Sequence, residues 1–373
     1  YCIIYMKNYL DFEKEIKALE EEVDSLKSPF GSEGISEVDT DKIKITQQEI
    51  NQKLKEIYAN LNSWQKTQVA RHEDRPKANY YIKKIFSQFT LLSGDRYFGD
   101  DKSVTAGFGL IENKSVLIIG QEKGEDLNSR IERNFGMMSP EGYRKCIRLM
   151  KLADRFKIPV ITFVDTPGAY PGIGAEERGQ ASAIAHSIEC CMSLKVPNIS
   201  IIIGEGGSGG AIALASSNKV IMLENSIYSV ISPEGCASIL WRDPGKSLEA
   251  AEAMKLSAQD LLKLGVIDEI IEEPLGGAHR NYDDMTTGIK KTIIENLNFF
   301  KNMSPDEIFE HRKNKFLKIG RDKGFVKSST DSDIGLSYEL TFLDKVKRAV
   351  FTNKYSIIIA SLVLFVTILA LYY

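Results

Sequence analysis

The sequence of 373 residues has few of the side chains that bind transition metals, with five cysteines and four histidines. No two cysteines have the C-x-x-C spacing of a zinc ribbon, and no histidine has a ligand-like neighbour, so we expect no metal site in this chain. Scattered cysteines are typical of reduced thiols in a cytosolic protein. The net charge of −3 gives no basic excess, and we therefore expect no nucleic-acid partner.

A phosphate-binding P-loop is also absent, because no Gly-Lys-Ser/Thr follows the glycine-rich segment at residues 201–215. That segment predicts a buried strand, a glycine-rich turn and the first turns of an Ala-rich helix. Glycines let a ligand approach the backbone closely, and a helix N-terminus adds unpaired N–H donors and the positive end of the helix dipole. The segment therefore predicts a place that holds a negatively charged oxygen.

Four interpretations of this segment stay open from the residues alone. The pattern G-x-G-x-x-G at 204–209, with Glu224 as the ribose acid, fits a dinucleotide site, although it lies in mid-chain. The pattern G-x-S-x-G at 206–210 fits a hydrolase nucleophile elbow, which needs a downstream Asp and His such as Asp268 with His279 or His311. The third is an oxyanion hole of backbone N–H groups, and the fourth is tight helix–strand packing.

The rest of the chain alternates between helical and strand patterns. Residues 8–27 and 46–64 have helical spacing, with a loop at 29–39 between them. After Phe86, we expect strands at 104–111, 114–120, 159–164, 198–203, 219–223 and 226–230, and helices at 140–156, 180–194 and 248–264. This alternation predicts an α/β layer structure.

Two loops follow the carboxyl ends of predicted buried strands. They are residues 165–174 and the glycine-rich residues 204–210. Ligands usually bind at this edge of such sheets. We therefore expect the two loops to share one site.

The C-terminal segment is unusually hydrophobic, because residues 356–373 form a run of 18 residues without a charge. Four basic residues precede it, at positions 345, 347, 348 and 354. A run of this length with a basic flank predicts a membrane-spanning helix whose basic side faces the cytoplasm. At the other end, five residues precede Met6, which is a candidate start, and nothing there resembles a signal peptide.

Several long blocks match one family in the right order. They lie at residues 68–76, 94–101, 133–145, 165–172, 174–180, 204–210, 228–241 and 273–280. On these blocks the chain, from about Leu10 to Arg321, resembles the carboxyltransferase alpha subunits of bacterial-type acetyl-CoA carboxylase. The resemblance outweighs the dehydrogenase and hydrolase interpretations, each of which rests on one loop.

The resemblance implies an α/β, crotonase-like fold, a spiral of ββα units. On this basis we expect a helical N-terminal region at residues 1–75, the carboxyltransferase core at 76–275 and a helical extension at 276–322. A linker at 323–352 and an appended hydrophobic helix at 353–373 would follow, and this tail is not expected of the family. Residues 78–81 also depart from the family pattern, which leaves the core assignment intact.

The resemblance also implies the reaction and its partners. In the family, an α2β2 assembly with a zinc-containing beta subunit moves CO2 from carboxybiotin to acetyl-CoA and gives malonyl-CoA for fatty-acid synthesis. A biotin carboxyl carrier protein and a biotin carboxylase complete the system. This chain itself would bind no cofactor. It is expected in the cytoplasm, with attachment to the inner face of a membrane through residues 356–373 as a further hypothesis.

This reaction develops negative charge on the ureido oxygen of biotin and on the thioester carbonyl oxygen, and both need preorganised N–H donors more than a side-chain base. Our candidate donors are the backbone N–H groups of Gly209 and Gly210, with Gly206 and Gly207 shaping the approach. The resemblance implies that this hole serves biotin and that the beta subunit serves the thioester. Further candidates are the pocket-lining residues Asp165, Thr166, Pro167, Gly168, Ala169, Tyr170 and Ser208, and, for CoA phosphates or carboxylates of another subunit, Arg133, Arg178 and Arg242.

Two rival functions stay open at this stage. A membrane-tethered, biotin-dependent decarboxylase subunit would share the fold and explain the hydrophobic tail. A non-catalytic scaffold that pairs with a beta subunit is the second rival.

Overall fold

The computed structural model describes residues 8–27, 30–31, 34–35 and 40–320. They belong to one compact unit that extends to Gly324. A second unit, Phe325–Tyr373, contains the predicted hydrophobic helix and nearly all of the predicted linker, and it lies outside the described residues. Among the described residues, no helix is both long enough and apolar enough to cross a bilayer.

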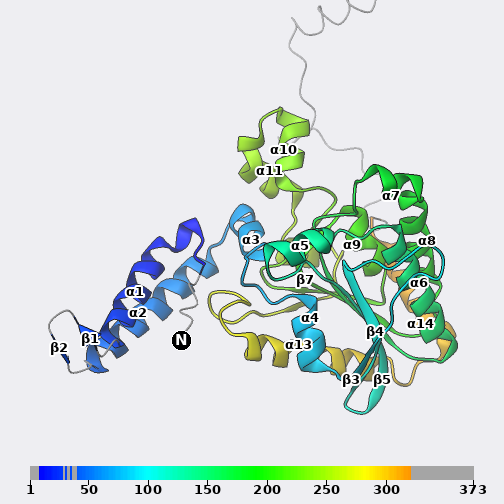
Figure 1. Cartoon of the computed structure of the whole chain (residues 1–373), viewed down its shortest axis with the longest axis horizontal. Helices are drawn as coiled ribbons and strands as arrows, with labels where there is room; N and C mark the ends of the chain where they lie inside the picture. The colour runs from blue at the N-terminus through cyan, green and yellow to red at the C-terminus, as the bar shows by residue number, and fades with distance from the viewer. Residues whose placement is uncertain (1–7, 28–29, 32–33, 36–39, 321–373) are drawn as a thin grey trace, which may run out of the picture. The chain divides into compact units, whose positions relative to one another are not determined.

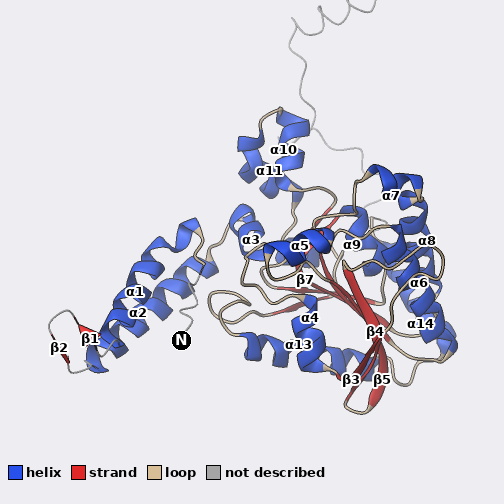
Figure 2. Ribbon diagram, viewed as in Figure 1, coloured by secondary structure: helices blue, strands red, loops and turns tan. Residues whose placement is uncertain are grey.

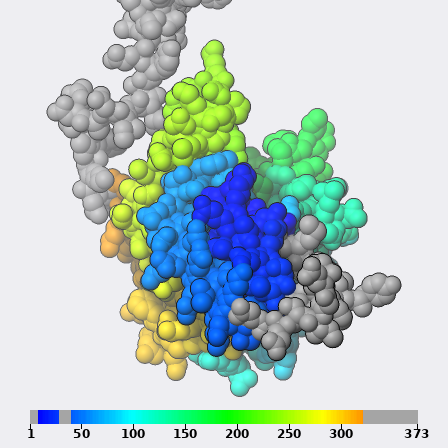
Figure 3. All heavy atoms as spheres, turned by 90° about the vertical axis from the view of Figure 1, so that its left-hand side faces the viewer, coloured from blue at the N-terminus to red at the C-terminus, as the bar shows by residue number. Residues whose placement is uncertain are grey.

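The N-terminal region is helical, as predicted. A short 3₁₀ helix, Asp11–Glu13, leads into α1 (Lys14–Lys27), which packs along α2 (Thr40–Ala59) through Ile16, Val23, Ile50 and Leu54. Figure 3 shows these helices, in blue, beside each other on one face. Between them, β1 (Phe30–Gly31) pairs with β2 (Gly34–Ile35) where we predicted only a loop.

The predicted helix at 46–64 has different boundaries in the structure. Helix α2 begins earlier and ends at Ala59, and a separate helix, α3 (Ser63–Ala70), follows. The break is local, because the Asn62 side chain accepts a hydrogen bond from the Gln65 N–H at 2.8 Å and caps the new helix.

The core is an eight-stranded sheet with the order β10-β8-β7-β6-β5-β4-β3, and β9 pairs with the end of β7. The strands β3, β4 and β5 are antiparallel neighbours, whereas the pairings from β5 to β10 and that of β9 with β7 are parallel. Their bounds are β3 Ser87–Leu91, β4 Val104–Ile111, β5 Lys114–Gln121, β6 Val160–Thr166, β7 Asn198–Gly207, β8 Lys219–Leu223, β9 Ile227–Ser229 and β10 Glu269–Ile271.

Helices cover both faces of this sheet (Figures 1 and 2). Leu149, Cys191 and Leu214 of α6, α8 and α9 belong to the hydrophobic core on one face, and Tyr81 and Ile289 of α4 and α13 to that on the other. The layers are therefore those of the predicted α/β protein. The helices after α3 are α4 Ala78–Ile85, α5 Leu127–Glu132, α6 Pro140–Arg155, α7 Ile173–Glu177, α8 Gln180–Ser193, α9 Ser208–Ala215, α10 Pro233–Trp241, α11 Ser247–Met254, α12 Ala258–Lys263, α13 Tyr282–Phe299 and α14 Pro305–Lys318.

Two elements have boundaries that differ from the predicted ones, each for a physical reason. The single helix predicted at 248–264 is two helices, because Lys255 has φ of 52° and Ser257 caps α12 by accepting the Asp260 N–H. Strand β7 extends four residues beyond the predicted end, through Gly204–Gly207. These residues stay in the strand because β9 pairs with residues 205–207 and Thr166 of β6 pairs with Gly206.

Candidate active site

The change from β7 to α9 occurs at a single residue, Ser208. Gly207 is the last residue of the strand, and Ser208 begins the helix with φ of 47°. A non-glycine residue rarely adopts this left-handed conformation, and such strain often occurs at functional sites. The glycine-rich turn is therefore shorter than the predicted residues 204–210. The predicted order of a buried strand, a turn and a helix is confirmed.

Two of the glycines permit a close approach of the loop after β6. A Cβ atom on Gly207 would lie 2.1 Å from the Pro167 carbonyl oxygen, and one on Gly210 would lie 2.5 Å from the Gly168 carbonyl oxygen. The packing interpretation therefore holds for Gly207 and Gly210. The two predicted loops lie against each other, as expected for one shared site.

Gly209 has different surroundings. A Cβ atom there would meet only Ile184, at 3.5 Å, which is an ordinary contact. Gly209 lines a cavity of about 480 Å³ that lies at the start of α9. Gly210 is buried and does not line this cavity. That the N–H groups of Gly209 and Gly210 form an oxyanion hole stays a prediction.

The cavity is mostly apolar apart from the start of the helix. Its lining comes from α9, β9 and the segments around α12, namely Ser208, Gly209, Ile212, Tyr228, Ser229, Val230, Met254, Leu261 and Val266. Tyr228 is the one titratable side chain among the described residues that line it, and burial raises the pKa of this phenol to about 12. The first N–H groups of any helix lack partners within the helix. The site can thus offer N–H donors but no side-chain base.

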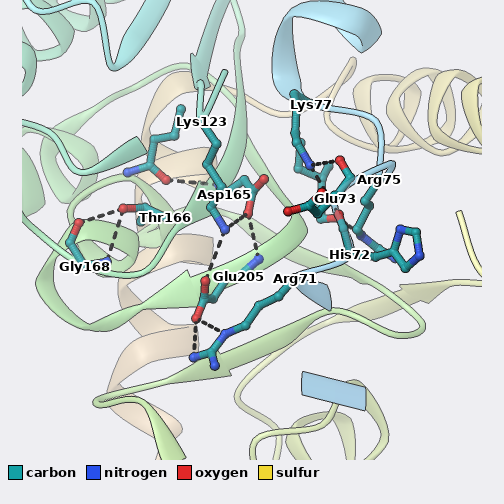
Figure 4. Close-up of polar contacts among 12 residues, drawn as sticks. Arg71, His72, Glu73, Arg75, Lys77, Lys123, Asp165, Thr166, Gly168 and Glu205 are labelled. Atoms are coloured by element: carbon teal, nitrogen blue, oxygen red, sulfur yellow. Dashed lines mark hydrogen bonds and ion pairs between the residues drawn. The ribbon is translucent and has the colours of Figure 1, made fainter. Parts of the chain in front are cut away.

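The loop after β6 is held by hydrogen bonds within the protein. The buried Asp165 carboxylate accepts the Glu205 N–H at 2.9 Å and pairs with the Lys123 ammonium at 2.8 Å (Figure 4). The Thr166 hydroxyl donates to the Gly168 carbonyl at 2.6 Å and accepts the Gly168 N–H at 3.2 Å. The Tyr170 N–H donates to the Met138 carbonyl, and Ala169 packs against the core. These contacts fit a structural role for Asp165 and Thr166.

A charged network lies beside this loop, and it was not predicted from the sequence. The Glu205 carboxylate pairs with Arg71 at 2.7 Å and with Lys123 at 3.1 Å, and Arg71 also pairs with Glu234 of α10 at 2.6 Å (Figure 4 draws the first two). Burial alone would raise the pKa of Glu205, but Lys123 and Arg71 outweigh it and hold the pKa below its usual value. Arg71 lies in a block that matches the family, and Glu205 lies inside the glycine motif, where the glycines and Ser208 were the residues considered.

The structure does not bring the predicted arginines to the cavity. Arg178 pairs with Glu141 at 2.6 Å and lies over the Phe98 ring, and Arg133 donates to the Lys102 carbonyl at 2.7 Å. Arg242 follows α10 in a left-handed conformation. None of the three lines the cavities beside the loop and α9. Their role with phosphates or carboxylates stays a prediction that these contacts do not support.

The geometry also decides against two earlier interpretations. Gly204 and Gly206 lie inside β7 and not in a strand-to-helix turn, which a dinucleotide site requires. Among the described residues, Ser208 makes no hydrogen bond to a histidine. His279 stacks on His72 with ring centroids 3.8 Å apart, and His311 lies next to Asn218. A hydrolase triad is therefore not assembled.

A substitution at Ser208 separates strain from chemistry. We expect Ser208→Gly to raise the free energy of unfolding by roughly 0.5–1 kcal/mol, because glycine adopts positive φ without the penalty of a Cβ atom. Activity should be retained if the hydroxyl group has no catalytic role. Ser208→Ala is the matched control, since it removes the hydroxyl and keeps the strain. Chemical denaturation measures the change in stability, and activity assays measure the role of the hydroxyl. Loss of activity in both variants would indicate that the Ser208 hydroxyl acts as a nucleophile.

Comparisons with known proteins agree on one family. Residues 9–320 match the family described as acetyl co-enzyme A carboxylase carboxyltransferase-like. The acetyl-coenzyme A carboxylase carboxyl transferase subunit alpha of Pelagibacter ubique is 66% identical over 353 residues, covering 92% of this chain and 96% of that protein. The subunit of the same name from Beijerinckia indica is 51% identical over 316 residues, covering 85% of this chain and 99% of that protein.

Solved structures show the fold. A transcarboxylase 12S crystal structure with methylmalonyl-coenzyme A bound matches with a TM-score of 0.50 and 17% identity, covering 60% of this chain and 41% of that chain. A second 12S structure, with hydrolysed methylmalonyl-coenzyme A, gives the same TM-score at 18% identity and covers 61% of this chain and 43% of that chain. The predicted crotonase-like α/β core is thus confirmed, while the predicted hydrophobic helix lies outside the described residues.

Proposed function

The chain belongs to the acetyl co-enzyme A carboxylase carboxyltransferase-like family, and from this membership we propose that it acts as the alpha subunit of an acetyl-CoA carboxylase carboxyltransferase. The subunit moves a carboxyl group from carboxybiotin, held on a carrier protein, to acetyl-CoA and so gives malonyl-CoA. The observation that supports this site best is the start of α9, which opens into a cavity where the described lining residues include no carboxylate, amine or imidazole.

Carboxyl transfer from carboxybiotin needs hydrogen-bond donors at the start of α9. Release of CO2 from carboxybiotin leaves negative charge on the ureido oxygen, and backbone N–H groups at a helix start stabilise such charge together with the helix dipole. Removal of one such donor typically lowers the rate by roughly 10²–10³-fold. The biotin anion itself can accept the methyl proton of acetyl-CoA, so a lining without a base is sufficient.

The partners belong to the same proposal. This chain would supply the donors for biotin, and a beta subunit would supply those for the thioester oxygen and carry the zinc. A biotin carboxyl carrier protein would deliver carboxybiotin after a biotin carboxylase has formed it. The names of the relatives support a beta partner, since they describe alpha subunits.

Co-expression with the candidate beta subunit tests the proposal. The two chains should purify together, and the complex should decarboxylate malonyl-CoA with free biotin as acceptor. Neither chain alone should do so. A stable complex without transfer would favour the scaffold, and the absence of any complex would contradict the assignment.

A further inference from the structure

A second cavity, of about 220 Å³, lies beside the loop after β6 and has a strongly charged lining. Four basic side chains, Arg71, Lys77, Lys123 and Arg130, and three acidic ones, Glu73, Asp165 and Glu205, line it. The two cavities share no lining residue. The two cavities are nevertheless adjacent, because Pro167 lines the charged one and lies against Gly207, the residue before Ser208 of the other. The charged cavity lies at the carboxyl ends of β6 and β7, the edge where α/β sheets bind ligands.

Lys77 differs from the other three basic residues in its partners. Arg71 pairs with Glu205 at 2.7 Å, Lys123 with Asp165 at 2.8 Å, and Arg130 with Glu73 at 3.4 Å. The Lys77 ammonium instead donates to the backbone carbonyls of His72, at 3.4 Å, and Glu73, at 3.1 Å (Figure 4). Within the described part of the chain, no carboxylate pairs with it.

This ammonium is also buried, since Lys77 is only 9% exposed. Burial lowers the pKa of Lys77 to about 8, Asp165 opposes that change, and Lys123, Arg130 and Arg75 reinforce it. A buried charge without a counter-charge is costly, and buried charges are normally paired. An ammonium has three donors, of which the two carbonyls account for two. The cavity thus offers the third donor of an ammonium that has no carboxylate partner among the described residues.

We propose that this cavity is a subsite for a monoanionic carboxylate, with the Lys77 ammonium as its counter-ion. A carboxylate suits the site better than a phosphate dianion, because Arg71, Lys123 and Arg130 already have carboxylate partners and a single ammonium is left to pair. Binding would pair the one cation, among the described residues that line this cavity, that lacks a carboxylate partner. The inference rests on the proposed function for the identity of the ligand, which is the carboxylate group being transferred.

Two carboxylated species carry that group in the proposed reaction, carboxybiotin and malonyl-CoA. The Lys77→Met variant keeps the length of the apolar stem and removes the charge. In the complex with the beta subunit, we expect it to raise the KM of the species whose carboxylate binds here about 10–100-fold, as for loss of a hydrogen bond to a charged group. Lys77→Arg should restore most of the affinity. Lys83→Met, an exposed lysine on α4, is the matched control.

Measuring the reaction in both directions identifies which of the two species places its carboxylate in the cavity. A higher KM for malonyl-CoA in decarboxylation would assign the malonyl carboxylate, and a higher KM for carboxybiotin in the forward reaction would assign the carboxybiotin carboxylate. If both KM values stay within about two-fold of wild type, the subsite is refuted while the carboxyltransferase assignment stands. A merely structural role would lower kcat and stability together without a selective change in KM.

A binding measurement on the wild-type complex keeps the inference testable if Lys77→Met does not fold. We would titrate [13C]acetate and inorganic phosphate by ligand-observed NMR between pH 6 and pH 10, a range on both sides of the Lys77 pKa of about 8. The charged form of Lys77 binds the anion, so acetate affinity should fall as the pH rises through this pKa. The charged groups that line the cavity with Lys77 or act on its charge are Asp165, Glu73, Glu205, Arg71, Lys123, Arg130 and Arg75, with His72 beside them. Acetate binding that does not change with pH, or binding of phosphate alone, would overturn the proposal.

Discussion

Replacing Gly210 by alanine is expected to lower the rate of carboxyl transfer about 10²-fold, although alanine is the better helix former. The new Cβ atom would lie 2.5 Å from the Gly168 carbonyl oxygen and 2.6 Å from its carbon, both of them backbone atoms. Either the loop or the start of α9 must move. A displacement near 1 Å at a reacting centre can cost about 10²-fold in rate.

Gly209→Ala is the matched control on the same helix turn. Its Cβ atom would meet Ile184 at an ordinary distance of 3.5 Å, so the start of α9 should keep its position. We expect this variant to fold at least as well as wild type and to keep most of the rate. Steady-state kinetics and thermal denaturation of both variants, in complex with the beta subunit, provide the comparison. Equal losses for the two would contradict the packing argument.

Removal of the charge of Arg75 is expected to destabilise the protein by about 3–5 kcal/mol. Arg75 and Glu273 form an ion pair whose side chains are 1% and 0% exposed. The Arg75 Nε group donates to the Ile203 carbonyl at 2.6 Å, and Glu273 also accepts the N–H groups of Asn225 and Ala278. The pair thus joins β7, at the residue before the glycine segment, to the carboxyl ends of β8 and β10. Arg75→Met leaves Glu273 buried without its partner, and urea denaturation measures the loss.

A double variant distinguishes the pair from simple loss of packing. In Arg75→Met/Glu273→Met no charge stays buried, so the loss in the free energy of unfolding should be smaller than the sum of the two single losses. Additive losses would contradict the role of the pair. The exposed pair Lys53–Glu15 is the control, and Lys53→Met should give no measurable change.

The Arg75–Glu273 pair also predicts that the free energy of unfolding depends on pH in the acid range. Burial would raise the pKa of Glu273, but the Arg75 charge and the hydrogen bonds outweigh it and hold the folded-state pKa below its usual value. A lowered folded-state pKa contributes stability that is present above the unfolded-state pKa, about 4.3, and is lost as the pH falls through the folded-state value. Arg75→Met should therefore flatten the decline in stability below about pH 4.

The local patterns predicted much of the fold. The alternation of strand and helix patterns after Phe86 was sufficient for the α/β class, and the strands predicted at 104–111 and 114–120 leave Glu112 and Asn113 for the turn between them. Both residues have positive φ, 44° and 63°, as a tight hairpin turn requires. The positions of the two strand-end loops also followed from the sequence, because parallel strands place their carboxyl ends at one edge.

The features that were not predicted depend on contacts between residues that lie far apart in the sequence. Glycine disfavours strands, yet residues 204–207 extend β7 because β9 and Thr166 pair with them. The Arg71–Glu205 pair joins residues 134 positions apart, and no local pattern indicates it. Lys77 likewise lacks a counter-charge only because the neighbouring carboxylates pair with other cations. The glycine motif predicted the site, but only the structure separates Gly209 at the cavity from Gly210 against the loop.

The most direct test of the proposed oxyanion hole is carboxyl transfer by Gly209→Val in the assembled complex. Valine adds two methyl groups beyond the Cβ atom, at a position that lines the cavity and has no backbone atom close to it. The measured quantity is transfer of labelled carboxyl from malonyl-CoA to free biotin, with complex formation checked separately. We predict an intact complex and a rate lowered by about 10²-fold, because the added methyl groups occupy the space beside the Gly209 N–H and displace the ureido oxygen from it. An intact complex with a rate within about two-fold of wild type would contradict the assignment of the α9 N-terminus as the reacting site.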